Sequence, residues 1–129
     1  MADALFDTTV FVDYRRGDTA AQALIQPILD GLSTASFSPI TVAELWQGKM
    51  TDRKEELEYT ALLTVMEEAP LGSNSARVAG YKLRDCSYNQ KADLFADALI
   101  AATAEERGEP IYTRNYKDFA RFYSNVKRY

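Results

Sequence analysis

Short apolar segments alternate with longer stretches of helical periodicity along the chain, and this alternation is the feature that most restricts its fold. Residues 4–7, 35–38 and 110–113 are short segments with apolar residues, bounded by polar or turn-forming ones, which is typical of buried strands. Strands separated by helices usually pair in parallel within one sheet that the helices cover. We therefore predict an α/β fold with a short-stranded central parallel sheet flanked by helices, formed by residues 1–129 as one domain.

The segments between the strands carry the start and stop signals of helices. Ser, Thr, Asp or Asn stands at most of the predicted starts, and glycine follows several of the predicted ends. Residues 69–71 are predicted to be extended, residues 86–91 to be polar and irregular, and residues 125–127 to form a last edge strand. The predicted helices cover residues 10–14, after a cap at Thr8 or Thr9, and residues 18–31, 39–46, 51–68, 73–85, 96–107 and 115–119.

The sequence contains no histidine and a single cysteine, Cys86. A Ser-His-Asp or Cys-His hydrolase needs an imidazole to accept the proton of its nucleophile, so these classes of enzyme are excluded. A structural zinc site and an intramolecular disulfide are excluded too, because the chain lacks the Cys and His residues for them. With 19 Asp and Glu residues, carboxylates are the leading candidates for catalytic groups.

Four carboxylates stand in unusual positions. Asp7 follows an apolar strand, Glu44 and Asp97 each interrupt an apolar helical segment, and Asp118 lies just past the strand at 110–113. Functional groups of parallel sheets gather beyond the carboxyl ends of the strands, where such carboxylates repel one another unless a cation neutralises them. Mg²⁺ or Mn²⁺ suits a set of oxygen ligands, and metal-activated water can hydrolyse a phosphodiester.

Each of these residues also has a simpler interpretation. Asp7 or Asp97 is explained equally well as a helix N-cap, and Glu44 as the partner of a nearby Lys or Arg. Asp118, taken alone, is interpreted as a solvated surface acid. Asp93, four residues before Asp97, is interpreted as a first-turn residue that interacts favourably with the helix dipole.

Four segments are LFDTTVFVD at residues 5–13, ITVAEL at 40–45, ADALIAATA at 96–104 and TRNYKDF at 113–119. In this order they resemble the motifs of the PIN domain family, and most closely those of the VapC-type ribonuclease toxins of toxin–antitoxin pairs. One such motif would be a weak signal, whereas four in order along the whole chain are a specific one. The resemblance implies the PIN fold, a central parallel sheet between helices, which agrees with the fold predicted above.

The resemblance also implies a role for each matching residue. Asp7, Glu44 and Asp97 match the three acidic metal ligands of PIN domains. The fourth position is left open between Asn115, as a neutral ligand, and Asp118, as a carboxylate. Thr8 matches a Ser or Thr that hydrogen-bonds in the metal shell. The implied activity is that of an endoribonuclease toxin dependent on Mg²⁺ or Mn²⁺, which cleaves RNA phosphodiesters with metal-activated water.

The charge of the chain is unevenly distributed. Its formal net charge is −4, yet residues 110–129 hold five basic residues against one acidic residue. Arg114 and Lys117 flank the predicted site and are the best candidates for binding RNA phosphates, whereas most other basic residues of this segment are expected to lie on the surface over core rings. The five basic residues are Arg114, Lys117, Arg121, Lys127 and Arg128.

The resemblance implies two protein partners, a cognate antitoxin and a second copy of the chain in a homodimer. VapC-like proteins hold an antitoxin segment in a groove of their early helices, although core packing is the expected role of the apolar stripe found there. The stripe consists of Trp46, Leu57, Ala61, Leu62, Val65 and Met66.

We expect a cytoplasmic protein without a membrane partner, because no apolar run approaches the roughly 18 residues of a membrane span.

Two alternative functions are left open. One is a PIN-type nuclease of RNA processing or DNA repair that has no antitoxin, and the other is a catalytically silent PIN-like interaction module. The polar stretch at residues 85–94 departs from the usual pattern of the family and precedes Asp97, so it is a candidate for altering access to the site.

Overall fold

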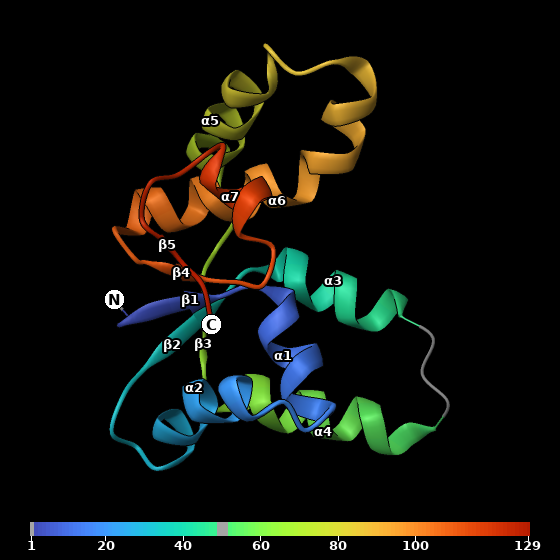
Figure 1. Cartoon of the computed structure of the whole chain (residues 1–129), viewed down its shortest axis with the longest axis vertical. Helices are drawn as coiled ribbons and strands as arrows, with labels where there is room; N and C mark the ends of the chain where they lie inside the picture. The colour runs from blue at the N-terminus through green and yellow to red at the C-terminus, as the bar shows by residue number, and fades with distance from the viewer. Residues whose placement is uncertain (1, 49–51) are drawn as a thin grey trace.

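The computed structural model describes residues 2–48 and 52–129, and the strands found there form one sheet in which every neighbouring pair is parallel (Figure 1). The strand order is β3-β2-β1-β4-β5, so β1 occupies the centre and the short strands β3 and β5 form the two edges. The predicted parallel sheet and the predicted edge strand at the end of the chain are thereby confirmed. The strands are β1 (Ala4–Phe6), β2 (Ala35–Phe37), β3 (Glu67–Glu68), β4 (Ile111–Tyr112) and β5 (Val126–Lys127).

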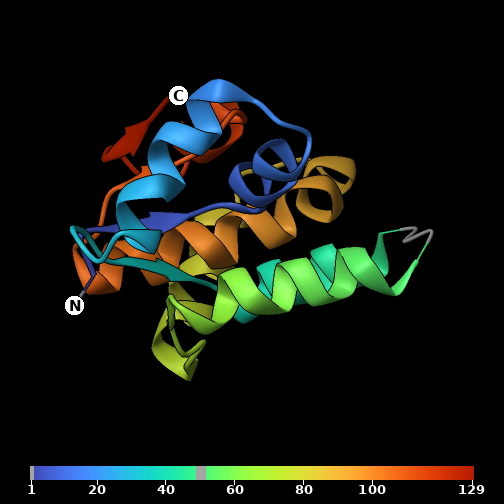
Figure 2. The same ribbon diagram turned by 90° about the horizontal axis from the view of Figure 1, so that it is seen from below.

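Helices cover both faces of the sheet. In Figure 1, α5, α6 and α7 lie above the sheet, whereas α1, α2 and α4 lie below it and α3 extends to one side. Figure 2 shows from below that α2 and α4 run over the same side of the fold. The helices are α1 (Thr8–Arg15), α2 (Thr19–Leu29), α3 (Pro39–Gln47), α4 (Arg53–Thr64), α5 (Ser73–Leu83), α6 (Tyr88–Arg107) and α7 (Tyr116–Ala120).

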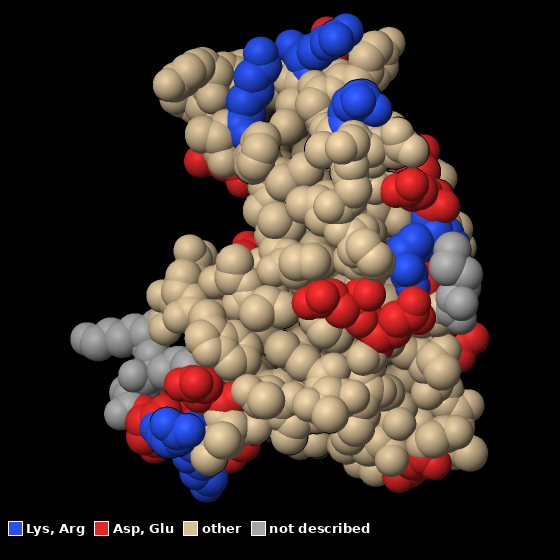
Figure 3. Space-filling model, turned by 180° about the vertical axis from the view of Figure 1, so that it is seen from behind, with Lys and Arg blue, Asp and Glu red and all other residues tan. Residues whose placement is uncertain are grey.

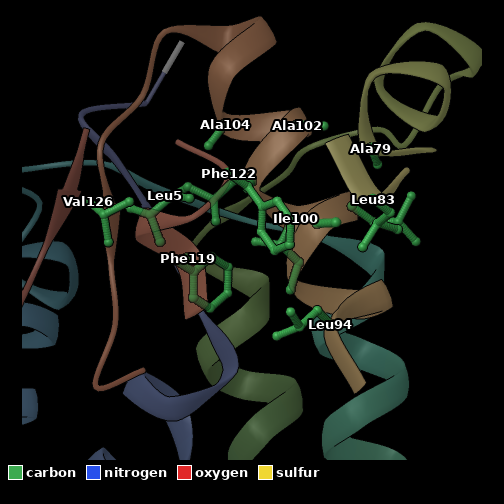
Figure 4. Close-up of a cluster of buried hydrophobic side chains, with 14 of the residues drawn as sticks. Leu5, Ala79, Leu83, Leu94, Ile100, Ala102, Ala104, Phe119, Phe122 and Val126 are labelled. Atoms are coloured by element: carbon green, nitrogen blue, oxygen red, sulfur yellow. The ribbon is translucent and has the colours of Figure 1, made fainter. Parts of the chain in front are cut away.

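The central strand divides the hydrophobic core into two clusters. Leu5 packs into the upper cluster, which holds side chains of α5, α6 and α7 (Figure 4), whereas Ala4 and Phe6 belong to the lower cluster with side chains of α1, α2 and α4. Successive side chains of a strand point to opposite faces, which explains this separation. All three residues of β1 are buried because helices cover both faces, as is usual for parallel sheets.

Side-chain caps start most of the helices where the sequence predicts them. Ser38 caps α3 with Pro39 as its first residue, as predicted, and Asp18 caps α2. The first helix is capped by Asp7, which confirms the interpretation of Asp7 as an N-cap, whereas the predicted cap at Thr8 or Thr9 was wrong. Asp7 therefore ends β1 and begins α1 at the same residue.

The predicted end of α4 and the predicted start of α6 at residue 96 were also wrong. The helix predicted over residues 51–68 ends at Thr64, because Glu67 and Glu68 instead pair with β2 as the edge strand β3. Its predicted first residue, Thr51, lies outside the described residues. The stretch at 86–91 is largely helical rather than irregular, because the Ser87 hydroxyl accepts from the Gln90 backbone and the Gln90 side chain accepts from that of Ser87.

The buried carboxylate of Glu109 ties the strands together at the amino end of the sheet. This residue is 1% exposed, and its carboxylate accepts hydrogen bonds from the Ser36 hydroxyl at 2.7 Å and from the Ala2 backbone N–H at 2.8 Å. Arg107 donates to it from Nε at 2.9 Å and also pairs with Glu67 at 2.9 Å. The negative charge of Glu109 is therefore fully compensated where it is buried.

Among the described residues, no helix is long and apolar enough to cross a membrane.

The capping box of α6 provides a test of this fold. Ser87→Ala removes the acceptor of the Gln90 backbone N–H, and we expect it to lower the free energy of unfolding by about 1 kcal/mol. Urea unfolding followed by circular dichroism measures the change. Ser124→Ala, at an exposed position outside the helices, is the matched control and should leave the midpoint unchanged.

Candidate active site

The acidic residues singled out in the sequence come together at the carboxyl edge of the sheet. Asp7 follows the central strand β1, Glu44 lies on α3 after β2, and Asn115 and Asp118 follow β4. Asp97 reaches the same place from the middle of α6 and is therefore not an N-cap. A hollow opens between α3 and the lobe formed by α5 and the start of α6, and acidic side chains border it (Figure 3).

Asp7 is the most deeply buried of these carboxylates and is 3% exposed. Hydroxyl groups hold it: the Thr113 hydroxyl donates to Asp7 Oδ2 at 2.7 Å and the Thr9 hydroxyl at 2.9 Å, with a longer bond from the Thr9 backbone at 3.4 Å. Burial raises the pKa of the Asp7 carboxyl, and these hydrogen bonds oppose the rise. Its side chain is thus fixed in position without a cation.

Thr8 connects Asp7 to Glu44. Its hydroxyl lies 2.7 Å from Glu44 Oε1 and 3.0 Å from the hydroxyl of the buried Thr41. Partial burial raises the pKa of Glu44, the Thr8 hydrogen bond lowers it, and the negative charge of Asp7 raises it further. Thr8 therefore orients the Glu44 carboxylate directly, and it follows Asp7, another carboxylate of the site, in the sequence.

Asn115 bridges the remaining two carboxylates. Its side-chain amide donates to Asp97 Oδ2 at 3.2 Å and to Asp118 Oδ2 at 2.9 Å. Burial raises the pKa of Asp97 to about 7, and the negative charges of Asp7, Glu44 and Asp118 contribute to this rise. The side chain of Asn115 supplies hydrogen bonds between Asp97 and Asp118 but no positive charge to balance them.

Within residues 2–48 and 52–129, no Lys or Arg forms an ion pair with Asp7, Glu44, Asp97 or Asp118. The interpretation of Glu44 as an ion-pair partner thus finds no support in that part of the chain. The four carboxylates form a concentration of negative charge that the protein itself leaves uncompensated there. Such a concentration lowers stability unless a positive group neutralises it.

The donor set fits a hard divalent cation in its chemistry, because it consists of carboxylate, amide and hydroxyl oxygens. In the described part of the chain, however, no three acidic or Cys side chains converge closely enough to enclose an ion by themselves. Mg²⁺ commonly binds through one or two carboxylates and keeps several waters, so a closed cage of side chains is not required. The residues suited to hold it are Asp7, Glu44, Asp97, Asp118 and the oxygen of Asn115.

The two predicted phosphate-binding residues differ in their surroundings. Arg114 pairs with Asp18 at 2.7 Å, lies 3.8 Å from Asp13 and stacks over the ring of Tyr129 at 4.4 Å. Lys117 is exposed and, within the described ranges, pairs with no carboxylate. Lys117 is therefore the more available cation of the two.

The site includes threonines that the sequence did not single out. Besides holding Asp7, the Thr113 hydroxyl accepts from the Asn115 backbone N–H at 2.9 Å, and that of Thr9 accepts from the Arg114 backbone N–H at 3.1 Å. These bonds fix the segment after β4 against the start of α1. The only signal in the sequence was their position, since Thr9 and Thr113 lie inside the quoted motifs.

A comparison with protein families confirms the assignment that this geometry suggests. The sequence matches the PIN domain over residues 4–125. The chain therefore belongs to the PIN domain family.

Individual relatives include a VapC ribonuclease and chains of toxin–antitoxin and VapBC complexes. The chain is 28% identical over 118 residues to Ribonuclease VapC19 of Mycobacterium tuberculosis, a match that covers 92% of this chain and 93% of that protein. Among solved structures it is similar to a toxin–antitoxin complex from Klebsiella pneumoniae, with 27% identity, a TM-score of 0.73, and coverage of 96% and 95% of the two chains. The fold also matches VapBC2 from Rickettsia felis bound to a promoter DNA fragment, with 18% identity, a TM-score of 0.74 and 98% of each chain covered.

The burial of Asp97, together with the repulsion from neighbouring carboxylates, predicts how stability responds to pH. A carboxyl with a pKa near 7 in the folded state and near 4 when unfolded binds its proton more tightly in the fold, so stability falls as pH rises between these values. Asp97→Asn removes this loss, and in metal-free buffer we expect a gain of roughly 2 kcal/mol above pH 7 that vanishes below about pH 4.

Thermal unfolding as a function of pH, with a chelator present, measures this effect. The control is Asp93→Asn, an exposed carboxylate one turn earlier on α6, which should give no such pH dependence. If Asp97→Asn is no more stable than the wild type at pH 8, the raised pKa of Asp97 in the folded state is contradicted.

Proposed function

We propose that this protein is the toxin of a toxin–antitoxin pair and acts as an endoribonuclease that depends on Mg²⁺ or Mn²⁺. The observation that carries the proposal is the convergence of four carboxylates with no cationic partner among the described residues. The resemblance to VapC19, which is named a ribonuclease, supports RNA as the substrate. The similarity to a toxin–antitoxin complex supports the biological role.

The chain's own residues would position the reaction. Asp7, Glu44, Asp97 and Asp118 would hold the ion, with Asn115 contributing at the fourth position. When bound, the ion would supply positive charge next to the scissile phosphate and activate water. Thr8 orients Glu44, and Thr113 and Thr9 orient Asp7, so the ligands are placed before the ion arrives.

An interaction module without catalysis would use these carboxylates for structural ion pairs. None of the four forms such a pair in the described part of the chain, which favours a nuclease over a silent module. A nuclease of RNA processing or DNA repair would share the same site, and is distinguished by lacking an antitoxin.

The catalytic proposal predicts that Asp7→Asn and Asp97→Asn each reduce RNA cleavage at least about a hundredfold, because each removes a charged ligand of the ion. Cleavage of total RNA by the purified protein with Mg²⁺ or Mn²⁺, compared with a chelator, measures the activity, and mapping the new 5′ ends identifies the sites. Asp93→Asn is the control with unchanged activity. Full cleavage by either variant would refute the proposal, as would cleavage that the chelator leaves intact.

An apolar groove supports the antitoxin partner. A cavity of about 620 Å³ lies between α2 and α4, and its lining includes Leu29 and Val65, which are 43% and 51% exposed. The apolar stripe expected to pack in the core is thus only partly buried: Leu62 is inside, whereas Leu57, Ala61 and Val65 face solvent. Exposed apolar surface of this kind is suited to an amphipathic segment of a partner.

We also propose a homodimer. Helix α5 exposes Val78 and Tyr81, and the first half of α6 exposes Tyr88 and Phe95. Large apolar side chains gathered on one lobe are typical of an interface rather than of free surface. This lobe borders the hollow, so a second copy bound there would lie beside the acidic site (Figure 3).

The groove allows antitoxin binding to be tested separately from RNA cleavage. Val65→Glu places a charge in the apolar groove, and we expect it to weaken binding of the cognate antitoxin by roughly tenfold or more, with RNA cleavage unchanged. Co-purification of the two proteins and cleavage in the presence of antitoxin measure both properties. Leu32→Glu is the matched control, because Leu32 is 82% exposed and lies outside the groove.

A further inference from the structure

A second cavity adjoins the acidic site on the side of β5. Its volume is about 420 Å³, and it lies where β4 and β5 end, beside the edge at which β1 presents Asp7. Three of its lining side chains are cationic and two are tyrosines, and the lining residues include no Asp or Glu. The lining residues are Thr113, Arg114, Asn115, Tyr116, Lys117, Arg128 and Tyr129.

Two residues that line the cavity also hydrogen-bond to carboxylates of the acidic site. Thr113 donates its hydroxyl hydrogen to Asp7, and the Asn115 amide reaches both Asp97 and Asp118. A ligand that occupied the cavity would therefore lie directly beside the carboxylates. One edge of the sheet thus places an acidic group and a basic, aromatic cavity side by side.

Arg128 stands out among the cations of this cavity. Its guanidinium carbon lies 4.1 Å from the ring centroid of Tyr116, so that the ring supports the charged group. Among the described residues it pairs with no carboxylate, unlike Arg114, which is engaged by Asp13 and Asp18. The N–H donors of Arg128 thus remain available for an anion, as does the ammonium group of Lys117.

An RNA strand that approaches four carboxylates is repelled by them, so a nuclease of this kind gains from cations placed next to the site. Proteins bind single-stranded RNA with cations on its phosphates and with aromatic rings or guanidinium planes against its bases. The cavity offers both kinds of group. A nucleotide bound there would lie next to Thr113 and Asn115, which contact Asp7, Asp97 and Asp118.

We infer that Arg128, Lys117 and Tyr116 form a nucleotide subsite, which binds the RNA nucleotide next to the one cleaved. This assignment rests on the proposed ribonuclease function for its biological meaning. In this assignment Arg128, rather than the Arg114 predicted from the sequence, makes the main contact with the RNA phosphate. Arg114, with its two carboxylate partners and Tyr129, instead holds the end of the described chain against the turn between α1 and α2.

Binding can be tested separately from cleavage. The probe is a short fluorescein-labelled single-stranded RNA of mixed sequence, and fluorescence anisotropy in a chelator at low salt gives its Kd. We expect Arg128→Gln and Lys117→Gln each to raise the Kd about tenfold, because each removes a cation that binds a phosphate. The slope of log Kd against log salt should fall by about 0.7 for each phosphate that the variant no longer neutralises.

Lys127→Gln is the matched control, because it removes the same charge from the exposed residue next to Arg128, and Lys127 does not line the cavity. Its Kd should equal that of the wild type, and thermal melting should show that all three variants are folded. In steady-state cleavage, Arg128→Gln should raise KM and leave kcat nearly unchanged.

Equal RNA affinity of Arg128→Gln, Lys117→Gln and the wild type would overturn the inference. The same holds if Arg128→Gln impairs only antitoxin binding, because the cavity would then belong to a protein interface. A wild type that binds RNA through Arg128 but never cleaves it with Mg²⁺ or Mn²⁺ would contradict the ribonuclease proposal and leave the subsite intact.

Discussion

The burial of Asp7 at the carboxyl end of the central strand is the constraint on which the site depends. A carboxylate almost without exposure is costly unless something compensates its charge. Threonine hydroxyls hold this one in place and add no positive charge. The nearby carboxylates of Glu44, Asp97 and Asp118 add charge repulsion to this cost rather than cancel it. The rest of the fold supplies the stability that allows this arrangement to persist.

Much of the architecture could be predicted from local signals. Strand β1 is an unbroken apolar run, and the Ser38–Pro39 pair marks the start of α3 through backbone chemistry that acts within a few residues. The rule that parallel strands present their carboxyl ends at one edge predicted that Asp7, Asn115 and Asp118 lie together. The shared role of Glu44 and Asp97, which lie inside helices, was implied by the resemblance to PIN domains.

Other features depend on contacts between distant residues, which local patterns do not contain. The edge strand β3 looked like a continuation of α4, because Glu67 and Glu68 favour a helix and only their pairing with β2 makes them extended. Residues 86–91 were predicted to be irregular because they are mostly polar, but the reciprocal cap between Ser87 and Gln90 starts a helix there. Thr113 gained its importance from Asp7, which lies 106 positions away in the sequence. The availability of Arg128 depends on which carboxylates lie near it in space.

The two ends of the sheet treat buried acids in opposite ways, and this has an evolutionary consequence. At the amino end Glu109 is matched by Arg107 and anchors strands to one another, whereas the acids at the carboxyl end have no such partner in the described chain. Mutations that neutralise the acids at the carboxyl end leave the anchoring network untouched. Inactive descendants with an intact fold are therefore easily reached by single mutations. A lineage that no longer needs the proposed activity can keep the same scaffold, and the surfaces proposed to bind partners, for other uses.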